Sequence, residues 1–366
     1  MGKVFSTFWP TFGTLLAATL GGLAFFVIGL PAPWIAGAMV AVTVLVVRGF
    51  PAIVPDGLRI PAFIFLGMSV GTGLSPETLD NIAKWPGTIA GLIVLVVAIT
   101  GVTGWYFQNR HGWDQPTAFF ASLPGALSTT MMLASTSAAN VPRVALAQSI
   151  RLFVLIALLP LLVAATSTEQ VQDYTPPVSS ALDLAVTLAA SVVAAWLFHL
   201  IRFPAGVLVG PMVASGGLHL LGLVEGRLPD GVLFPGFIVL GALIGARFVG
   251  ARGPDLRHYL GAGLGGFAVG VTISLAMAAA FSAVFGLPFG QVLLAFAPGG
   301  LEAMTVMAFA LNLDPAFVAT HQLVRFVGMS LIVPLVAARL GLLRDPSLTG
   351  KAGAARASAE PPKGKS

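Results

Sequence analysis

Long apolar runs, separated by short polar or proline-rich segments, dominate the pattern of this chain. The runs from Thr88 to Trp105 and from Leu182 to Ile201 approach or reach the roughly 20 residues that an α-helix needs to cross about 30 Å of hydrocarbon. Comparable runs recur along most of the sequence. In the first half the pattern predicts five membrane spans, near residues 12–28, 34–47, 59–74, 88–107 and 144–163.

The second half repeats the pattern of the first at a nearly constant shift. A shift of 174 residues, without a gap, matches Leu66 with Leu240, Gly71 with Gly245, Pro124-Gly125 with Pro298-Gly299, Gln148 with Gln322, Arg151 with Arg325 and Pro160 with Pro334. Such self-similarity predicts a duplicated fold. We therefore divide the chain into a membrane repeat at 12–163, an external linker at 164–181, a second membrane repeat at 182–342 and a disordered basic cytoplasmic tail at 343–366.

Each half also contains one apolar segment that proline and glycine interrupt. Pro116 to Ala139 is interrupted at Pro124, and Pro288 to Leu313 is interrupted at Pro298. Proline removes a backbone donor and glycine frees the backbone, so each segment is expected to be two short helical arms joined by non-helical residues. The pattern alone leaves open whether each segment crosses the membrane or turns back.

The distribution of positive charge favours the second arrangement, because Lys and Arg accumulate on the cytoplasmic side. If both segments turn back, the second half is inverted and only Lys84 and Arg227 lie outside. The cations then placed inside are Lys3, Arg48, Arg59, Arg110, Arg143, Arg202, Arg252, Arg257, Arg344 and those of the tail. The predicted fold class is thus an all-α polytopic membrane protein of two inverted five-span repeats, each with a re-entrant broken-helix hairpin, about ten spans and two hairpins in all. Both termini are cytoplasmic, and for a bacterial chain the membrane is the inner one.

The amino-acid composition also indicates a protein that lies in the lipid bilayer. Hydrophobic residues make up 57% of the 366 and charged residues 9%, too little polar surface to coat a soluble globule of this length. The absence of cysteine excludes disulfides and thiolate sites. The formal charge of +5 comes from Lys and Arg placed singly between apolar runs, which we interpret as topology signals and not as a nucleic-acid surface.

The two interruptions are the first candidates for chemistry. Irregular backbone at membrane depth is tolerated where protein or a water-filled cavity satisfies its polar groups, and unpaired amides at the start of a helical arm favour an anion. The simpler alternative is a proline-glycine kink packed against its neighbours. The candidate solute-binding residues at the tips are Pro124, Gly125, Ser128, Thr129, Pro298, Gly299 and Gly300. Ser128 and Thr129 could equally bond back to their own helix.

Polar residues inside the following spans are the second set of candidates. Arg151 and Arg325 lie about seven residues into equivalent spans, and each follows a glutamine, Gln148 or Gln322, by three residues. Intramembrane charge usually faces the bundle interior, although a long arginine side chain can also snorkel to the interface. His321 shares one helical face with Arg325. Glu302, directly after the second tip, could pair with Arg325 or His321 or carry a coupling proton.

Several function classes lack support in the sequence. The histidines show no paired ligand spacing, so we expect no metal and no cofactor. Phosphate-binding loops, nucleophile elbows and zinc-protease motifs are missing, so we expect no enzyme. The expected partners are a small-molecule solute and the lipid bilayer, without direct contact to nucleic acid. The sequence leaves open whether the chain forms a homo-oligomer.

The Leu-Pro-Gly and Pro-Gly-Gly-Leu-Glu-Ala-Met signatures, the Asp314-Pro315 step and the run from His321 to Arg325 resemble the bacterial membrane AbrB family, a duplicated membrane domain. The resemblance extends from about Thr14 to Leu342. The acid at Glu302 has no counterpart in the first half, where Ser128 stands. Members have been labelled as regulators of gene expression and as ammonia monooxygenases, but an oxygenase needs metal ligands and direct regulation needs a soluble nucleic-acid domain.

These observations favour a secondary transporter of a small anionic solute, with alternating access at a midplane site between the two tips. The alternative is a membrane-embedded sensor that affects gene expression indirectly, and a channel is third. A sensor would normally carry an output domain, which a partner protein could also supply.

Overall fold

The computed structural model of the protein describes residues 2–72, 85–125, 127–166, 178–203, 205–248 and 255–342. Side chains are described for these residues except 2–6, 127–129, 230, 248 and 255–259. The predicted tail at 343–366, residues 167–177 of the predicted linker, Lys84 and Arg252 lie outside the described residues. Within them the structure is all-helical, with one isolated β-bridge between Val178 and Arg227.

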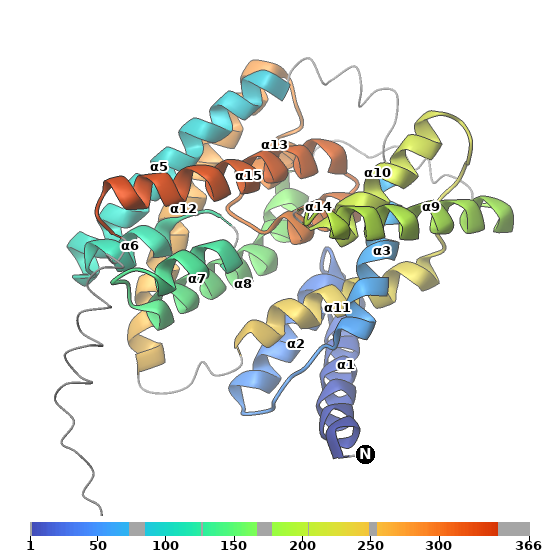
Figure 1. Cartoon of the computed structure of the whole chain (residues 1–366), viewed down its shortest axis with the longest axis horizontal. Helices are drawn as coiled ribbons and strands as arrows, with labels where there is room; N and C mark the ends of the chain where they lie inside the picture. The colour runs from blue at the N-terminus through green and yellow to red at the C-terminus, as the bar shows by residue number, and fades with distance from the viewer. Residues whose placement is uncertain are drawn as a thin grey trace, which may run out of the picture.

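The described helices fall into two groups that take equal parts from both halves of the sequence (Figure 1). The six-helix group contains α1 (Gly2–Ile28), α2 (Pro33–Val47), α3 (Asp56–Thr72), α9 (Ala181–Leu200), α10 (Gly206–Leu220) and α11 (Asp230–Gly245), which a short 3₁₀ helix, η2 (Ala246–Phe248), extends. The eight-helix group contains α5 (Trp85–His111), α6 (Gln115–Ser122), α7 (Leu127–Ser135), α8 (Val141–Thr166), α12 (Asp255–Phe285), α13 (Phe289–Phe296), α14 (Leu301–Ala310) and α15 (Pro315–Arg339). Contact between the groups is made chiefly by α3 with α14 and α15, and by α8 with α2 and α11.

The bounds of these helices recur at the shift found in the sequence. A shift of 174 residues carries α6 onto α13, and a shift of 173 carries α2 onto α10. The alanines before α2 and α10, Ala32 and Ala205, both adopt a left-handed backbone, with φ of 49° and 51°. Equivalent segments of the sequence therefore fold into equivalent local structure.

Glycines bring helices of the two halves close together. A Cβ built on Gly71 of α3 would lie 2.6 Å from the carbonyl oxygen of Met212 in α10. A Cβ on the equivalent Gly245 of α11 would lie 2.7 Å from the carbonyl oxygen of Met39 in α2. Small residues permit such backbone approach in lipid, where packing is the main attraction between helices.

Helices α5 and α12 of the eight-helix group run antiparallel (Figure 1). Gly91 lies against Phe281, and further along α5 Phe107 lies against Gly266. Glycines on these helices thus leave room for aromatic rings of the partner helix, although nothing lies within 4 Å of a Cβ built on Gly261.

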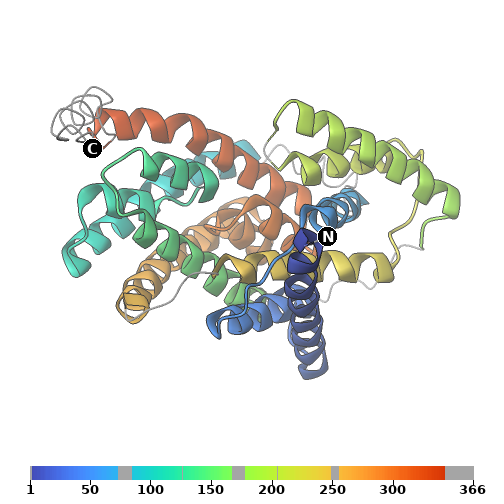
Figure 2. The ribbon, with the colours of Figure 1, turned by 60° about the horizontal axis from the view of Figure 1, so that its bottom comes forward.

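Six of the described helices are long and apolar enough to span a membrane: parts of α1, α5, α8, α9, α12 and α15. The helices α2 and α10 are apolar but have only 15 residues each, and α11 has 16. Large apolar side chains such as Phe26 on α1 and Trp196 on α9 are exposed, as a lipid-facing surface requires. The helices therefore indicate a membrane protein, while the predicted count of ten spans stays a prediction. Figure 2 shows the same arrangement from a second side.

Candidate functional site

Both interrupted segments consist of two short helices joined by a non-helical break. Helix α6 ends at Ser122 and α7 begins at Leu127, while α13 ends at Phe296 and α14 begins at Leu301. Four carbonyl groups at the end of a helix have no partner within it. In an apolar interior these carbonyls need donors from elsewhere.

Side chains of α8 supply the donors at the first break. The Nε2 atom of Gln148 donates to the carbonyl oxygens of Phe120 and Leu123, both at 3.0 Å. One guanidinium nitrogen of Arg151 donates to Leu123 at 2.8 Å, and another donates to Oε1 of Gln148 at 2.6 Å. Gln148 and Arg151 are both buried. The Nε atom of Arg151 has no partner among the described residues.

Side chains of α15 repeat the arrangement at the second break. Gln322 donates to the carbonyl oxygens of Leu294 at 2.9 Å and Ala297 at 3.3 Å. Arg325 donates to Ala297 and to Gly299, each at 2.6 Å, and to the side-chain oxygen of Gln322. The acceptors Leu294 and Ala297 are the residues that a shift of 174 assigns to Phe120 and Leu123. We call each Gln-Arg pair, with its carbonyl acceptors, a clamp.

The clamps place positive charge where the two short helices end. The last carbonyls of a helix carry partial negative charge, and a cation there is stabilising. A guanidinium group buried without such acceptors would be costly. Arg151 and Arg325 therefore fix the backbone of the breaks, a role that the sequence did not reveal.

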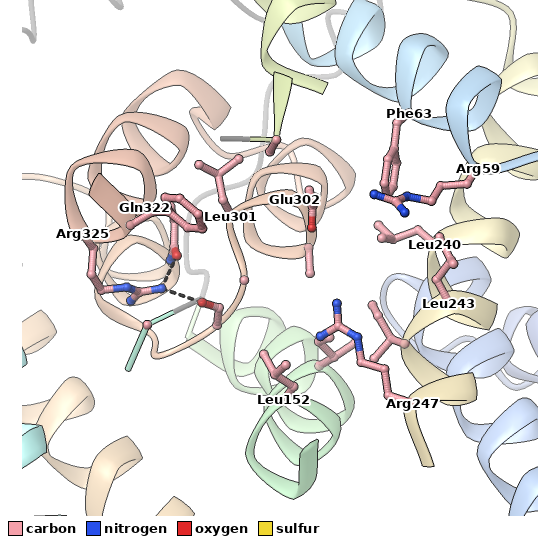
Figure 3. A pocket seen from close by; sticks show the side chains of 18 of the residues that line it. Arg59, Phe63, Leu152, Leu240, Leu243, Arg247, Leu301, Glu302, Gln322 and Arg325 are labelled. Carbon is pink, nitrogen blue, oxygen red and sulfur yellow. Dashed lines mark hydrogen bonds between the residues drawn. The ribbon is translucent and has the colours of Figure 1, made fainter. Parts of the chain in front are cut away.

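A cavity of about 630 Å³ lies where the second break faces the six-helix group (Figure 3). Gly125 of the first break and Gly299 of the second both line it, together with Gly300, Arg325 and Phe326. Its other lining residues are Arg59, Phe63, Met131, Leu152, Ile156, Ala205, Leu240, Leu243, Ile244, Arg247, Leu301, Glu302, Ala303 and Gln322. The two tips thus contribute to one cavity, between two groups of helices.

Charged side chains enter this cavity from opposite sides. Glu302, in the first turn of α14, comes from the eight-helix group. Arg59 of α3 and Arg247 of η2 come from the six-helix group, and Figure 3 shows their guanidinium groups pointing toward the space beside Glu302. Arg247 interacts electrostatically with Glu302 and also with Arg59. A carboxylate in the first helical turn is further stabilised by the partial positive charge of that end.

His321 is fully buried against α5 and does not line the cavity. Its Nε2 atom lies 2.7 Å from the hydroxyl of Thr88, and its Nδ1 atom lies 2.8 Å from the carbonyl oxygen of Phe317. No ion pair joins Glu302 to Arg325 or His321 in the part of the chain that the structure describes.

The structure brings together about half of the predicted site residues. Gly125, Gly299, Gly300, Glu302, Gln322 and Arg325 line the cavity, whereas Pro124, Gln148, Arg151, Pro298 and His321 do not. The side chains of Ser128 and Thr129 lie outside those described. Whether any of these residues binds a solute stays a prediction.

Arg59 and Arg247 line the cavity, although the sequence pattern did not mark them as site residues. Both stand near helix ends, where we interpreted arginine as a topology signal. Neither has an arginine at its equivalent position: Leu233 corresponds to Arg59, and Gly73 to Arg247. The repeat therefore could not single them out.

Comparison of the sequence with known proteins places the chain in a family. The model of the family described as "Transition state regulatory protein AbrB" matches residues 34–341. A protein of Escherichia coli (strain K12) named "Putative regulator AbrB" is 27% identical over 327 residues, which cover 86% of this chain and 92% of the relative. "Uncharacterized protein YhjN" of Bacillus subtilis (strain 168) is 25% identical over 296 residues, covering 74% and 75% of the two chains.

Proposed function

The chain belongs to the AbrB family, and we propose that it acts there as a secondary transporter of a small anionic solute. The observation that carries the proposal is the shared cavity: Gly125 and Gly299, at equivalent positions of the two halves, line one space between two helix groups. Irregular backbone at membrane depth is expected where it lines such a cavity. Broken helices meeting at a site between inverted repeats are a recurring plan of transporters.

Helix directions support the inverted arrangement of the repeats. Helices α5 and α12 are equivalent in the two halves, yet they run antiparallel. Helix α11, the equivalent of α3, runs parallel to α2, because Gly241 approaches Ile35 and Gly245 approaches Met39. If successive helices cross the membrane in alternating directions, α3 runs opposite to α2. The second half is then inverted, and the segments containing the two breaks are re-entrant hairpins that enter from opposite faces.

The proposed orientation assigns a side to the cavity. With both termini cytoplasmic, α3 begins and α11 ends on the cytoplasmic side of the inner membrane. Arg59 lies in the first turn of α3, and Arg247 follows the end of α11. Both line the cavity, so this conformation faces inward. Movement of one helix group relative to the other would expose the site to the outside, which is alternating access.

Transport is tested by reconstituting the purified chain into liposomes and measuring uptake of radiolabelled organic anions, beginning with benzoate and succinate. We expect uptake above that of protein-free liposomes. Replacement of Gly299 by Val should reduce uptake more than it reduces membrane expression, because the backbone at Gly299 lines the cavity and would have to shift to relieve the contact of the new side chain with Met304, 2.6 Å from a built Cβ. Equal loss of uptake and expression would favour a structural kink at this position.

A membrane-embedded sensor is the second candidate. The name of the Escherichia coli relative, "Putative regulator AbrB", favours it. A sensor would bind its solute without moving it across the bilayer, and it would act on transcription through a partner protein. We propose no direct contact with nucleic acid, and neither an enzymatic activity nor a cofactor. Saturable binding of a solute by the purified chain, with no uptake of that solute into liposomes, would select the sensor over the transporter.

A further inference from the structure

The cavity holds two arginines that the clamps do not use. Arg325 has its guanidinium group committed to two carbonyls and to Gln322. Arg247 forms no hydrogen bond or ion pair with any described residue. Arg59 has an exposed ion pair with Asp56 at 3.4 Å, of a kind that contributes little to stability. Arg59 and Arg247 therefore retain donors for a ligand.

Glu302 is the opposite charge available to these two arginines inside the cavity. It is the acidic residue among those lining the space, so the described ionisable groups are three arginines and one glutamate. Arg325 is already held by the clamp, so Arg59 and Arg247 together with the one carboxylate leave a single positive charge unbalanced. A second carboxylate, brought by a solute, would balance it.

Most of the other residues that line the cavity are apolar, and this bears on the kind of anion that would fit. Phe63, Leu240 and Leu243 enter from the six-helix group, while Leu152 and Ile156 enter from α8. Pockets for organic ligands combine such walls with a few polar anchors. A guanidinium group offers a planar fork that matches a carboxylate in two places. An inorganic ion would leave the apolar walls without a contact.

We propose that Arg59 and Arg247 bind the carboxylate of an organic anion with an apolar body, and that Glu302 is the internal counterion with which the solute competes. The proposal rests on the proposed function for the identity of the cavity as a solute site. It assigns anion binding to Arg59 and Arg247 of the six-helix group, and not to the clamp arginines of the eight-helix group. A solute held in this way contacts both helix groups, since the arginines belong to the six-helix group and the apolar residues Leu152 and Ile156 belong to α8 of the eight-helix group.

The test is isothermal titration calorimetry of the full chain in detergent, with benzoate, succinate and inorganic phosphate as separate probes. We expect the wild-type chain to bind at least one of the carboxylates more tightly than phosphate. Arg59→Gln and Arg247→Gln should each weaken that binding roughly 10- to 100-fold, the worth of a charge-assisted hydrogen bond. The corresponding lysine variants should be intermediate, because lysine keeps the charge without the fork. Glu302→Gln should strengthen binding, because it removes the competing carboxylate.

Arg339→Gln, in the last turn of α15 and outside the cavity, is the matched control and should bind like wild type. Melting temperatures near that of wild type would show that the variants are folded. Unchanged binding in both Arg59→Gln and Arg247→Gln would overturn the proposal, as would equal or tighter binding of phosphate. Absence of carboxylate binding in both wild type and Glu302→Gln would overturn it as well. Binding that behaves as expected, without uptake into liposomes, would keep this site and reject transport instead.

Discussion

The side-chain amide of Gln322 donates to the carbonyl oxygen of Leu294 at 2.9 Å, and this contact ties the last turn of α13 to α15. Gln148 makes the equivalent contact with Phe120 at 3.0 Å, between α8 and α6. Backbone carbonyls that end a helix inside a protein require such donors. The paired contacts explain why two helices of eight residues each can end in buried surroundings.

The clamp predicts that Gln322→Leu destabilises the protein. Leucine has a similar size but cannot donate, so the carbonyl of Leu294 loses its side-chain donor at a cost of about 1–3 kcal/mol, whereas the carbonyl of Ala297 keeps Arg325. The melting temperature of the purified chain should fall relative to Gln108→Leu, a control on the exposed surface of α5. Equal melting temperatures for the two variants would show that the clamp is not needed for stability.

The glycine contacts between the halves predict a second loss of stability. Gly71→Ala would place a Cβ 2.6 Å from the Met212 carbonyl oxygen, and Gly245→Ala would place one 2.7 Å from that of Met39. Neither backbone can yield without separating the helices, so both variants should melt below wild type. Gly217→Ala in α10 is the control, because nothing lies within 4 Å of its Cβ, and it should cause no loss. Tolerance of alanine at both contact positions would contradict this packing.

Sidedness of the two hairpins is the third prediction. The chain has no cysteine, so single cysteines can be labelled with a membrane-impermeant maleimide. Asn140→Cys, before α8, should react from the cytoplasmic side, and Asp314→Cys, before α15, should react from outside. Both residues cap the helix that follows: Asn140 accepts from Arg143, and Asp314 accepts from Ala316. Reaction of both cysteines from the same side would reject the inverted repeats.

The two breaks are features of the fold that the local sequence determines. Proline and glycine at 124–125 and at 298–300 predicted both breaks, because their backbone constraints act locally whatever surrounds them. The shift of 174 residues also carried the bounds of α6 onto those of α13. The resemblance to the AbrB family, based on the same segments, is confirmed.

The acceptors of the clamps could not be predicted in the same way. Gln148, Arg151, Gln322 and Arg325 were singled out as buried polar residues, but carbonyls occur at every residue and become unsatisfied only where a helix ends. The positions of Arg59 and Arg247 beside Glu302 could not be predicted for a different reason. Their approach to Glu302 depends on how α3 and η2 are placed beside α14, which is a tertiary relationship that spacing along the chain does not encode.

The tip at Gly300 provides the fourth prediction, which separates occupation of the cavity from damage to the fold. Gly300 lines the cavity and precedes α14, its φ of −88° suits any residue, and nothing lies within 4 Å of a built Cβ. Gly300→Leu should therefore fold, at a cost limited to about 1 kcal/mol for a changed cap, while its side chain fills part of the solute space. Carboxylate binding, measured by calorimetry, should weaken at least tenfold with little change in melting temperature. Gly328→Leu, in α15 and equally free of neighbours, does not line the cavity and should bind like wild type. If both leucine variants bind the carboxylate as wild type does, the space beside Gly300 is not where the solute lies, and the site would have to be sought elsewhere in the protein.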